Sequence, residues 1–211
     1  MCFHQIFQNR NVLITGHTGF KGSWLTAWLK ELGAQVTGVA LDPPTKPSHF
    51  LAAQLGEGIQ DLRVDLRDQK TLKEVIRTVQ PEFVFHLAAQ PLVRQSYSNP
   101  VDTYATNVMG TLHLLEALRE VKQSCVAVLI TSDKCYDNVE WVWGYRETDR
   151  LGGPDPYSAS KGAAELVIRS HIHSFFPIQG NVRIGIGRAG NVIGGGDWAE
   201  DRIVPDCVNA W

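Results

Sequence analysis

The sequence of 211 residues lacks the features that mark several classes of protein. It has no basic surplus, because 20 Lys and Arg residues face 22 Asp and Glu residues, so no nucleic-acid partner is expected. No apolar run approaches the roughly 18 residues that a membrane span requires, and no basic stretch with an apolar run opens the chain. We therefore expect a cytoplasmic protein without a membrane partner.

Cysteine is scarce and unpaired in the sequence. Cys2, Cys125, Cys135 and Cys207 form no Cys-x-x-Cys motif, so neither a zinc site nor a dense disulfide framework is expected. His171 and His173 are two residues apart on a predicted helix and face different directions, which disfavours a metal pair. No metal site is predicted.

Apolar segments alternate between the spacing of strands and that of helices. Hydrophobic residues make up 44% of the chain, enough for a real core. The alternation predicts an α/β fold with a doubly wound, mostly parallel sheet and Rossmann-like topology. The expected strands are 11–15, 35–41, 59–64, 83–88, 126–132 and 182–188, and the expected helices are 23–32, 69–79, 101–121 and 157–176. The length suits one large domain, here residues 1–188, with the start of a second.

A glycine motif lies between the first predicted strand and helix. Gly16-x-x-Gly19-x-x-Gly22 has the form of a dinucleotide-binding turn, in which glycines let the backbone approach a pyrophosphate at a helix N-terminus. We expect this loop to bind the cofactor through Gly16, Thr18, Gly19, Phe20 and Gly22. Lys21 is interpreted as a solvated residue at the helix start, and the alternative is a modest phosphate partner. The alternative is that the glycines only shape a turn.

Acidic and small residues follow the next strands. Asp42 lies 20 residues after Gly22 and ends the second strand, where it would bind a ribose, repel a 2′-phosphate and so favour NAD over NADP. The alternative is that Asp42 merely starts a loop. Asp65 and Leu66 end the third strand and are expected to face the adenine, while Ala88 and Ala89 line the cofactor channel after the fourth.

Two clusters carry reactive groups. Tyr157 and Lys161 lie four residues apart at the start of a predicted helix, so both project from one face. A tyrosine base near pH 7 needs roughly 4 kcal/mol of phenolate stabilisation, which Lys161 and a nicotinamide ring can supply together. Ser132, Asp133 and Lys134 follow the fifth strand as a substrate hydroxyl ligand, an acid and a base. The alternatives are that Tyr157 and Lys161 are ordinary surface residues, and that residues 132–134 are only the polar end of a strand.

These motifs resemble the extended short-chain dehydrogenase/reductase family. Thr15-Gly16-x-x-Gly19-x-x-Gly22, Asn107-Val108-Met109-Gly110-Thr111 and the Tyr157/Lys161 pair carry the resemblance. Further segments are similar to its NAD-dependent sugar-nucleotide 4,6-dehydratases, among them Phe20 to Trp24, His86 to Tyr97, Thr131 to Tyr136 and Arg188 to Trp198. Within that group Asp133-Lys134 replaces an Asp-Glu pair, as it does in the enzymes that act on CDP-glucose. The resemblance also implies Asn107 as a cofactor ligand.

The resemblance implies a reaction and a set of partners. Tyr157, helped by Lys161 and Ser132, would deprotonate the C4 hydroxyl of CDP-glucose while NAD takes the hydride, after which Lys134 would act as base at C5 and Asp133 as acid at C6. It implies Gln90, Arg94, Ser96 and Asn191 as substrate ligands. The product would feed deoxysugar and lipopolysaccharide synthesis. It also implies a homodimer through a four-helix contact.

The resemblance has one departure near the end of the sequence. Residues 189–211 are expected to begin a substrate-binding region that is largely missing. A catalytically inactive NAD-binding fragment therefore remains an alternative. A related sugar-nucleotide epimerase or reductase is a further one.

Overall fold

A single parallel sheet organises the chain. The computed structural model describes residues 5–211, so Cys2 lies outside the described part. The strand order is β3-β2-β1-β4-β5-β6, and every neighbouring pair is parallel. This confirms the predicted doubly wound fold. The order reverses between β1 and β4, and ligands bind outside the carboxyl ends of strands at such a point. The strands are β1 Asn11–Thr15, β2 Gln35–Ala40, β3 Gln60–Arg63, β4 Phe83–His86, β5 Cys125–Ser132 and β6 Val182–Ala189.

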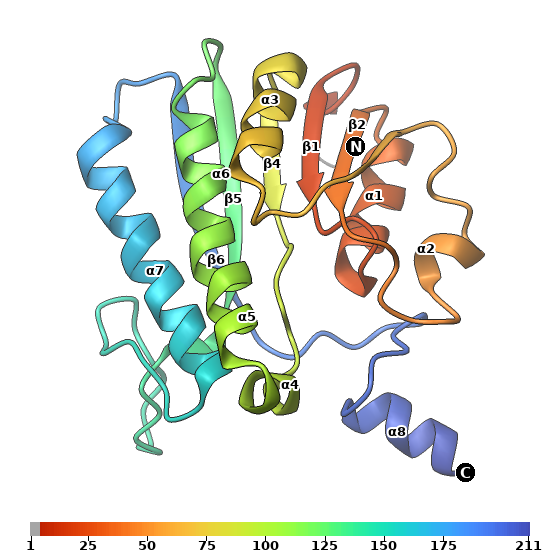
Figure 1. Cartoon of the computed structure of the whole chain (residues 1–211), viewed down its shortest axis with the longest axis vertical. Helices are drawn as coiled ribbons and strands as arrows, with labels where there is room; N and C mark the ends of the chain where they lie inside the picture. Colours follow the sequence, from red (N-terminus) through yellow and green to blue (C-terminus); the bar gives the residue numbers. More distant parts are fainter. Residues whose placement is uncertain (1–4) are drawn as a thin grey trace.

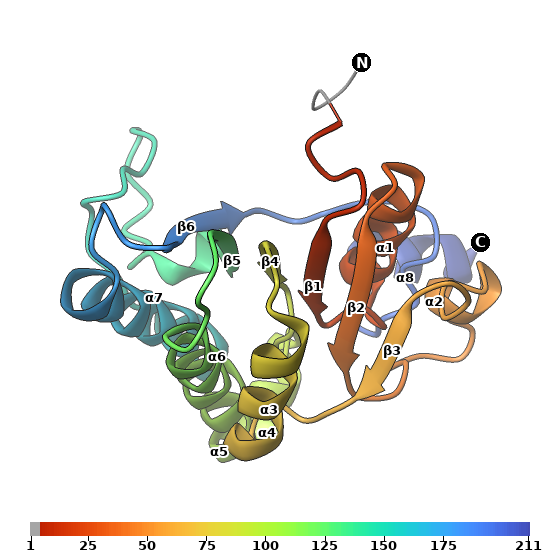
Figure 2. The ribbon, with the colours of Figure 1, turned by 90° about the horizontal axis from the view of Figure 1, so that it is seen from above.

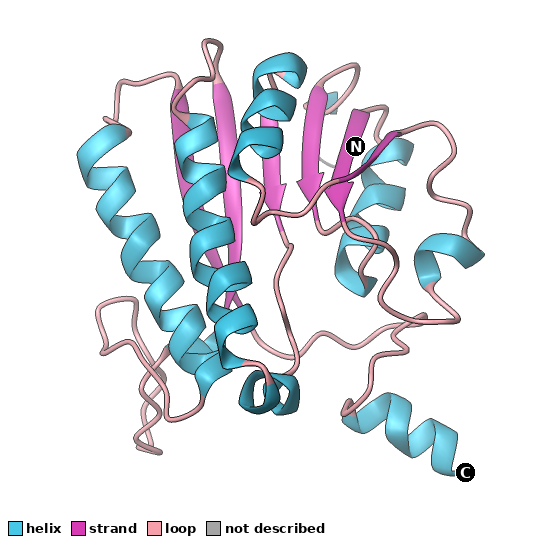
Figure 3. Ribbon diagram, in the orientation of Figure 1, coloured by secondary structure: helices cyan, strands magenta, loops and turns pink. Residues whose placement is uncertain are grey.

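Helices cover both faces of the sheet. Helix α1 lies on one face, and α3, α6 and α7 lie side by side on the other (Figures 1 and 2). The loops that follow the strands gather along the carboxyl edge of the sheet (Figure 3). The helices are α1 Phe20–Glu31, α2 His49–Ala52, α3 Gln69–Val79, α4 Val93–Ser98, α5 Pro100–Tyr104, α6 Gly110–Leu118, α7 Pro156–Phe175 and α8 Ile203–Ala210.

The main core lies between the sheet and the α3–α6–α7 layer. Leu72 of α3, Leu114 of α6 and Ile168 of α7 are buried against alternate residues of β5, including Ala127 and Leu129. This alternation is the one that a strand with one face on the core requires. The packed layer gives the reactive part of the carboxyl edge a rigid base.

The start of α7 is fixed by its own sequence. The Asp155 carboxylate accepts a hydrogen bond from the Ser158 backbone N–H at 3.0 Å, and Pro156 occupies the first helical turn. Both are preferred at these positions because they satisfy or avoid the free N–H groups of a helix start. Tyr157 is thereby placed at the carboxyl edge of the sheet.

Several boundaries differ from prediction. Helix α1 begins at Phe20 rather than Ser23, and the predicted helix 101–121 is α5, a π-helical turn Ala105–Met109 and α6 in succession. Helices α2, α4 and α8 were not predicted. The first two are only four and six residues long, too short for a periodic pattern to emerge. The irregular region 133–155 holds a 3₁₀ turn, Asp133–Cys135, and one bridge between Tyr136 and Leu151.

Neither a membrane-spanning helix nor a metal-binding cluster is found within the described residues. In residues 5–211 no helix has the length and apolarity to cross a membrane. Over the same range, no cluster of three or more His, Cys, Asp or Glu side chains is arranged to hold a metal ion. Cys125, Cys135 and Cys207 are free.

Candidate active site at the carboxyl edge of the sheet

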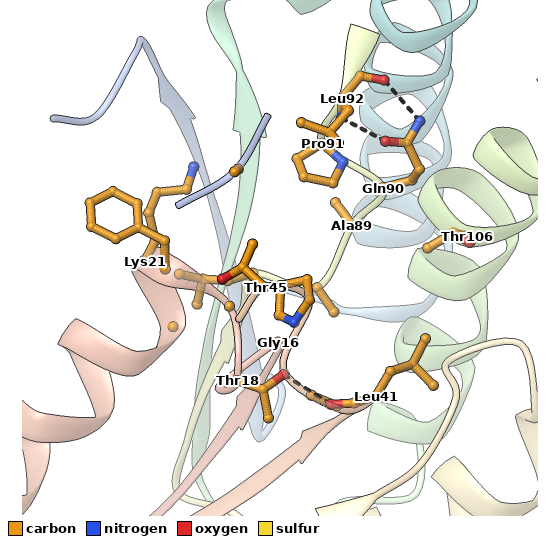
Figure 4. A pocket seen from close by; sticks show the side chains of 18 of the residues that line it. Gly16, Thr18, Lys21, Leu41, Thr45, Ala89, Gln90, Pro91, Leu92 and Thr106 are labelled. Atoms are coloured by element: carbon orange, nitrogen blue, oxygen red, sulfur yellow. Dashed lines mark hydrogen bonds between the residues drawn. The ribbon is translucent and has the colours of Figure 1, made fainter. Parts of the chain in front are cut away.

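One cavity of about 840 Å³ runs along the carboxyl edge of the sheet (Figure 4). It extends from the end of β2, past the glycine loop, to the start of α7, with segment 196–202 as its outer wall. Most of the predicted cofactor ligands line it: Gly16, Thr18, Gly19, Phe20, Gly22, Asp42, Asp65, Leu66, Ala88, Ala89, Tyr157 and Lys161. Residues from five strand ends thus meet in one space.

The glycine loop depends on backbone packed against backbone. Gly16 has φ +78°, and a Cβ there would lie 2.7 Å from the backbone N of Ala88. A Cβ on Gly22 would lie 2.0 Å from the carbonyl oxygen of Gly16. Gly19 is the N-cap of α1 and no side chain caps that helix, so its first N–H groups are available to an anion. The Thr18 hydroxyl donates to the Leu41 carbonyl at 2.9 Å and ties the loop to the end of β2.

Charged residues lie around the end of the cavity beside β2, which we call its outer end. Asp42 is 90% exposed and its carboxylate accepts a hydrogen bond from Arg63 Nε at 3.1 Å. Arg63 also binds Asp61, whose other contact is His17 Nε2 at 2.7 Å. Burial lowers the pKa of His17 although Asp61 opposes the change. These contacts were not predicted from the sequence, because Asp42 and His17 lie far from Asp61 and Arg63 along the chain.

Asp65 and Leu66 have different surroundings. The Asp65 carboxylate accepts two hydrogen bonds from Arg67 Nε, at 3.0 and 2.9 Å, and these lower its pKa. Arg67 also pairs with Asp102 at the start of α5. Leu66 is buried in the main core and presents only part of its surface to the cavity. An adenine here would meet Leu66 as its apolar neighbour.

A buried hydrogen-bond network lies behind the middle of the cavity. Asn107, in the π-helical turn, accepts from the Gln90 backbone N–H at 2.8 Å and donates to the Gln90 carbonyl and to Ser160 Oγ at 3.1 and 2.9 Å. Asn107 does not itself line the cavity. It joins the loop after β4 to α7, in keeping with the tendency of π turns to occur at functional positions.

The predicted substrate ligands are divided between cavity and scaffold. Gln90 lines the cavity, but its side-chain amide is hydrogen-bonded to the backbone of Leu92 (Figure 4). It also donates to the Thr103 hydroxyl. Ser96 is fully buried and accepts from the Tyr157 backbone N–H at 3.1 Å. Arg94 is exposed and pairs with Asp201 at 2.9 Å. Asn191 is the one of these four beside the reactive groups, 3.5 Å from Lys134 Nζ.

The predicted reactive groups converge at the start of α7. The Ser132 hydroxyl donates to Asp133 Oδ1 at 2.9 Å, and Ser132 lies close enough to Tyr157 to influence its pKa. The Asp133 carboxylate lies 3.6 Å from Lys134 Nζ. The Nζ atom of Lys161 is 6.0 Å from the centre of the Tyr157 ring. Three residues at the end of β5 and in the turn after it, and two residues of α7, therefore form one cluster of hydroxyl and ionisable side chains.

The surroundings of Tyr157 and Lys161 shift the pKa values of both side chains. Burial raises the pKa of Tyr157, and the neighbouring Ser132 side chain opposes this rise. Burial and the nearby charge of Lys21 lower the pKa of Lys161 to about 8. Lys21 itself lines the cavity, where enclosure and Arg202 lower its pKa. Lys21 is nevertheless exposed to solvent, as expected for a residue at the start of the helix.

The segment after β6 packs against α1 and α2 by means that the sequence did not reveal. Trp24 Nε1 donates to the Gly195 carbonyl at 2.9 Å, and the Trp24 ring stacks on His49 with ring centres 4.3 Å apart. Gly196 has φ +81°, and a Cβ there would lie 2.7 Å from Cβ of His49. The glycines of this segment therefore let it form the outer wall of the cavity.

Comparison with known proteins identifies the family. A family model described as GDP-mannose 4,6 dehydratase matches residues 13–183. The chain belongs to this family. Among curated members of related sequence, it is 54% identical over 209 residues to the CDP-glucose 4,6-dehydratase of Salmonella typhimurium, an alignment that covers 97% of this chain and 58% of that protein. The chain thus spans little more than half the length of that dehydratase.

More distant relatives share the fold of this dehydratase family. The chain is 31% identical to the UDP-glucose 4-epimerase of Mycoplasma genitalium, covering 75% of this chain and 47% of the epimerase. A solved structure described as MoeE5 in complex with UDP-glucose and NAD superposes with a TM-score of 0.77 at 27% identity, covering 95% of this chain and 60% of that one. The UDP-glucose 4-epimerase of Thermus thermophilus, solved as a complex with NAD, gives a TM-score of 0.71 at 29% identity, covering 84% and 54%.

Proposed function

We propose that this chain acts in the conversion of CDP-glucose to CDP-4-keto-6-deoxyglucose and water. The observation that carries the proposal is that Tyr157 and Lys161 line one end of the cavity that begins at the glycine loop. Ser132, Asp133 and Lys134 do not line the cavity themselves, but they directly follow Thr131, which does. The 54% identity to the Salmonella enzyme supports CDP-glucose as the substrate. A sugar-nucleotide 4,6-dehydratase needs both an oxidation site and an elimination site, and these five side chains supply groups for each.

NAD is the cofactor that we assign to the cavity. The contacts of Gly16 and Gly22 leave no room for side chains, which brings backbone N–H groups to the place where a pyrophosphate would lie. The cavity volume of about 840 Å³ is in the range of small-molecule sites, about 300–1,000 Å³. Asp42 would bind the ribose, with Asp65 and Leu66 near the adenine. When bound, NAD would take a hydride from sugar C4 and return it at C6.

The side chains of the cluster divide the proton transfers between them. Tyr157, as phenolate, would accept the proton of the C4 hydroxyl, and Lys161 and Ser132 would stabilise its negative charge. The resulting ketone at C4 acidifies C5–H. Lys134 would accept the C5 proton, and Asp133 would donate a proton to the C6 hydroxyl so that it leaves as water. The electrons of the C5–H bond form the new C5–C6 double bond. The hydride returned at C6 and a solvent-derived proton returned at C5 by Lys134 would then saturate this bond and give the 4-keto-6-deoxy product.

Deuterium incorporation tests this assignment directly. Purified chain is incubated with NAD⁺ and CDP-glucose in D₂O, and the sugar is followed by NMR. We expect a 4-keto-6-deoxy product with deuterium at C5, and Lys134→Ala should reduce its rate about 100-fold or more, as for loss of a general base. Lys73→Ala, which removes an exposed lysine from α3, is the matched control. A chain that binds NAD⁺ without forming product would overturn the dehydratase assignment and leave the cofactor site standing.

We also propose a homodimer formed through a four-helix contact, to which each chain contributes the segment 101–121, which holds α5 and α6, and helix α7. Val101 and Leu166 expose apolar side chains on α5 and α7, and apolar surface of this kind is typical of protein contacts. Sedimentation equilibrium should give twice the chain mass. Val101→Glu with Leu166→Glu should return it to the mass of one chain, and an unchanged mass would contradict this interface.

A further inference from the structure

Glu165 is a buried acid that the proposed reaction does not use. It lies on α7, four residues after Lys161 and eight after Tyr157, so all three side chains project from neighbouring positions of one helix face. Its side chain is 0% exposed and does not line the cavity. A carboxylate at such depth needs full pairing, because burial without partners strongly disfavours its charge.

The partners of Glu165 come from the ends of two strands. Arg188 of β6 donates from Nε to Oε1 at 2.9 Å and from Nη2 to Oε2 at 2.7 Å. Thr131 of β5 donates its hydroxyl to Oε1 at 2.6 Å. Thr131 and Arg188 are direct neighbours in the register of β5 and β6. One carboxylate thus joins α7 to the carboxyl ends of both strands.

The same contacts fix the turn that carries Ser132, Asp133 and Lys134. The turn begins after Thr131 and leads to Tyr136, whose ring lies 4.5 Å from the guanidinium carbon of Arg188. Both ends of the turn are therefore held by groups that meet at Glu165. Burial alone would raise the pKa of Glu165, but the hydrogen bonds from Arg188 and Thr131 hold it below its ordinary value, so the carboxylate stays charged.

We propose that Glu165 is a positioning residue that sets the distance between Ser132 on β5 and Tyr157 on α7. It acts through Thr131 and Arg188 and touches neither the substrate nor the cofactor. The inference rests on the proposed function only in giving Tyr157 and Ser132 their roles in catalysis.

The proton affinity of Tyr157 reports this distance. Its neighbours are Ser132 and Asp133 from the end of β5, Asp155 and Lys161 from α7, and Arg202 from the segment before α8. Ser132 opposes the rise in the pKa of Tyr157 that burial causes. If β5 moved away from α7, this effect of Ser132 would weaken and the phenol would titrate at higher pH.

The test places a fluorinated tyrosine at position 157 and follows its titration by ¹⁹F NMR, without substrate or turnover. Thr131→Val removes one hydroxyl from the carboxylate at equal volume, Glu165→Gln removes its charge, and Thr131→Ser restores the hydroxyl. We expect the first two to raise the titration midpoint by about half a pH unit or more, the size of one lost hydrogen bond. Thr131→Ser should leave it unchanged.

Leu72→Ala in the core under α3 controls for instability alone, and it should lower the melting temperature without moving the midpoint. An unchanged midpoint in folded Thr131→Val and Glu165→Gln would overturn the proposal. If Glu165→Gln does not fold, Thr131→Val decides. Because no turnover is measured, failure of the dehydratase assay and failure of this inference are separate results.

Discussion

The two ends of the cavity are held together by different means. At the glycine loop, backbone packs on backbone, and the atoms nearest to an added Cβ on Gly16 or Gly22 belong to the main chain. At the start of α7, buried polar side chains such as Asn107 and Glu165 join separate elements through hydrogen bonds. The first end should therefore be sensitive to added volume. The second should be sensitive to the loss of a polar atom even when volume is preserved.

The largest effect is expected for Gly22→Ala. Its Cβ would lie 2.0 Å from the Gly16 carbonyl oxygen, and since that atom is backbone, the loop must shift. We expect a loss of about 3 kcal/mol or more in the free energy of unfolding, measured in urea, and loss of NAD⁺ binding. Gly144→Ala, where a Cβ meets nothing within 4 Å, is the control. Equal stability of the two variants would contradict the claim that close backbone packing holds the glycine loop together.

The next largest effect is expected for Asn107→Ala. The substitution leaves the buried backbone N–H and carbonyl of Gln90 without their partner, at a cost of about 2–3 kcal/mol in the free energy of unfolding. Asn138→Ala, whose hydrogen bonds lie at the surface, should cost less than about 1 kcal/mol in the same denaturation experiment. If Asn107→Ala is as mild as Asn138→Ala, hydrogen bonds do not organise the reactive end.

His86 links the two ends and should make stability depend on pH. Its ring nitrogens are hydrogen-bonded to the hydroxyls of Thr15, at 2.7 Å from Nδ1, and of Thr111, at 3.0 Å from Nε2. Burial, with the charge of Lys161, lowers the pKa of His86 to about 3. The unfolded chain binds this proton near pH 6.5, so the folded state loses stability as pH falls from about 6.5 towards 3.

From this single group we expect about 2 kcal/mol less stability at pH 5 than at pH 7. Denaturation of the wild type and of His86→Gln at both pH values isolates the effect. The pH-dependent loss should be smaller in His86→Gln by that amount. Identical pH dependence in the two proteins would show that His86 is not held neutral by its surroundings.

The smallest effect is expected at the exposed outer end. Asp42→Ala breaks an exposed pair with Arg63, which should change the free energy of unfolding by less than about 0.5 kcal/mol. The preference for NAD⁺ over NADP⁺ should nevertheless fall by about tenfold, the equivalent of about 1.4 kcal/mol. Calorimetric titration with both cofactors measures this ratio. An unaltered ratio would mean that Asp42 does not bind the ribose.

Local sequence patterns predicted the strands and the glycine loop well. Alternating apolar residues and glycines act over a few positions, so the parallel sheet and the cavity edge followed from spacing alone. The pairing of Ser132 with Tyr157 was implied by the family resemblance and did not follow from spacing.

Contacts between distant segments could not be predicted in the same way. Asp42 is paired with Arg63 across two strands, and Ser96 serves the backbone of Tyr157 rather than facing the cavity. Nothing in the spacing of such residues distinguishes a buried partner from a ligand. Helix α8 was not predicted, although Ile203, Val204 and Val208 recur at helical spacing; none of its residues is buried.

The most direct test of the account is an NMR titration of the labelled chain with NAD⁺. If the two ends form one cofactor cavity, the amide signals of Gly16 to Gly22, of Ala88 to Gln90 and of Tyr157 to Lys161 should shift with one common saturation curve. Shifts confined to the glycine loop, or different curves for the two ends, would contradict the claim that a single dinucleotide joins them.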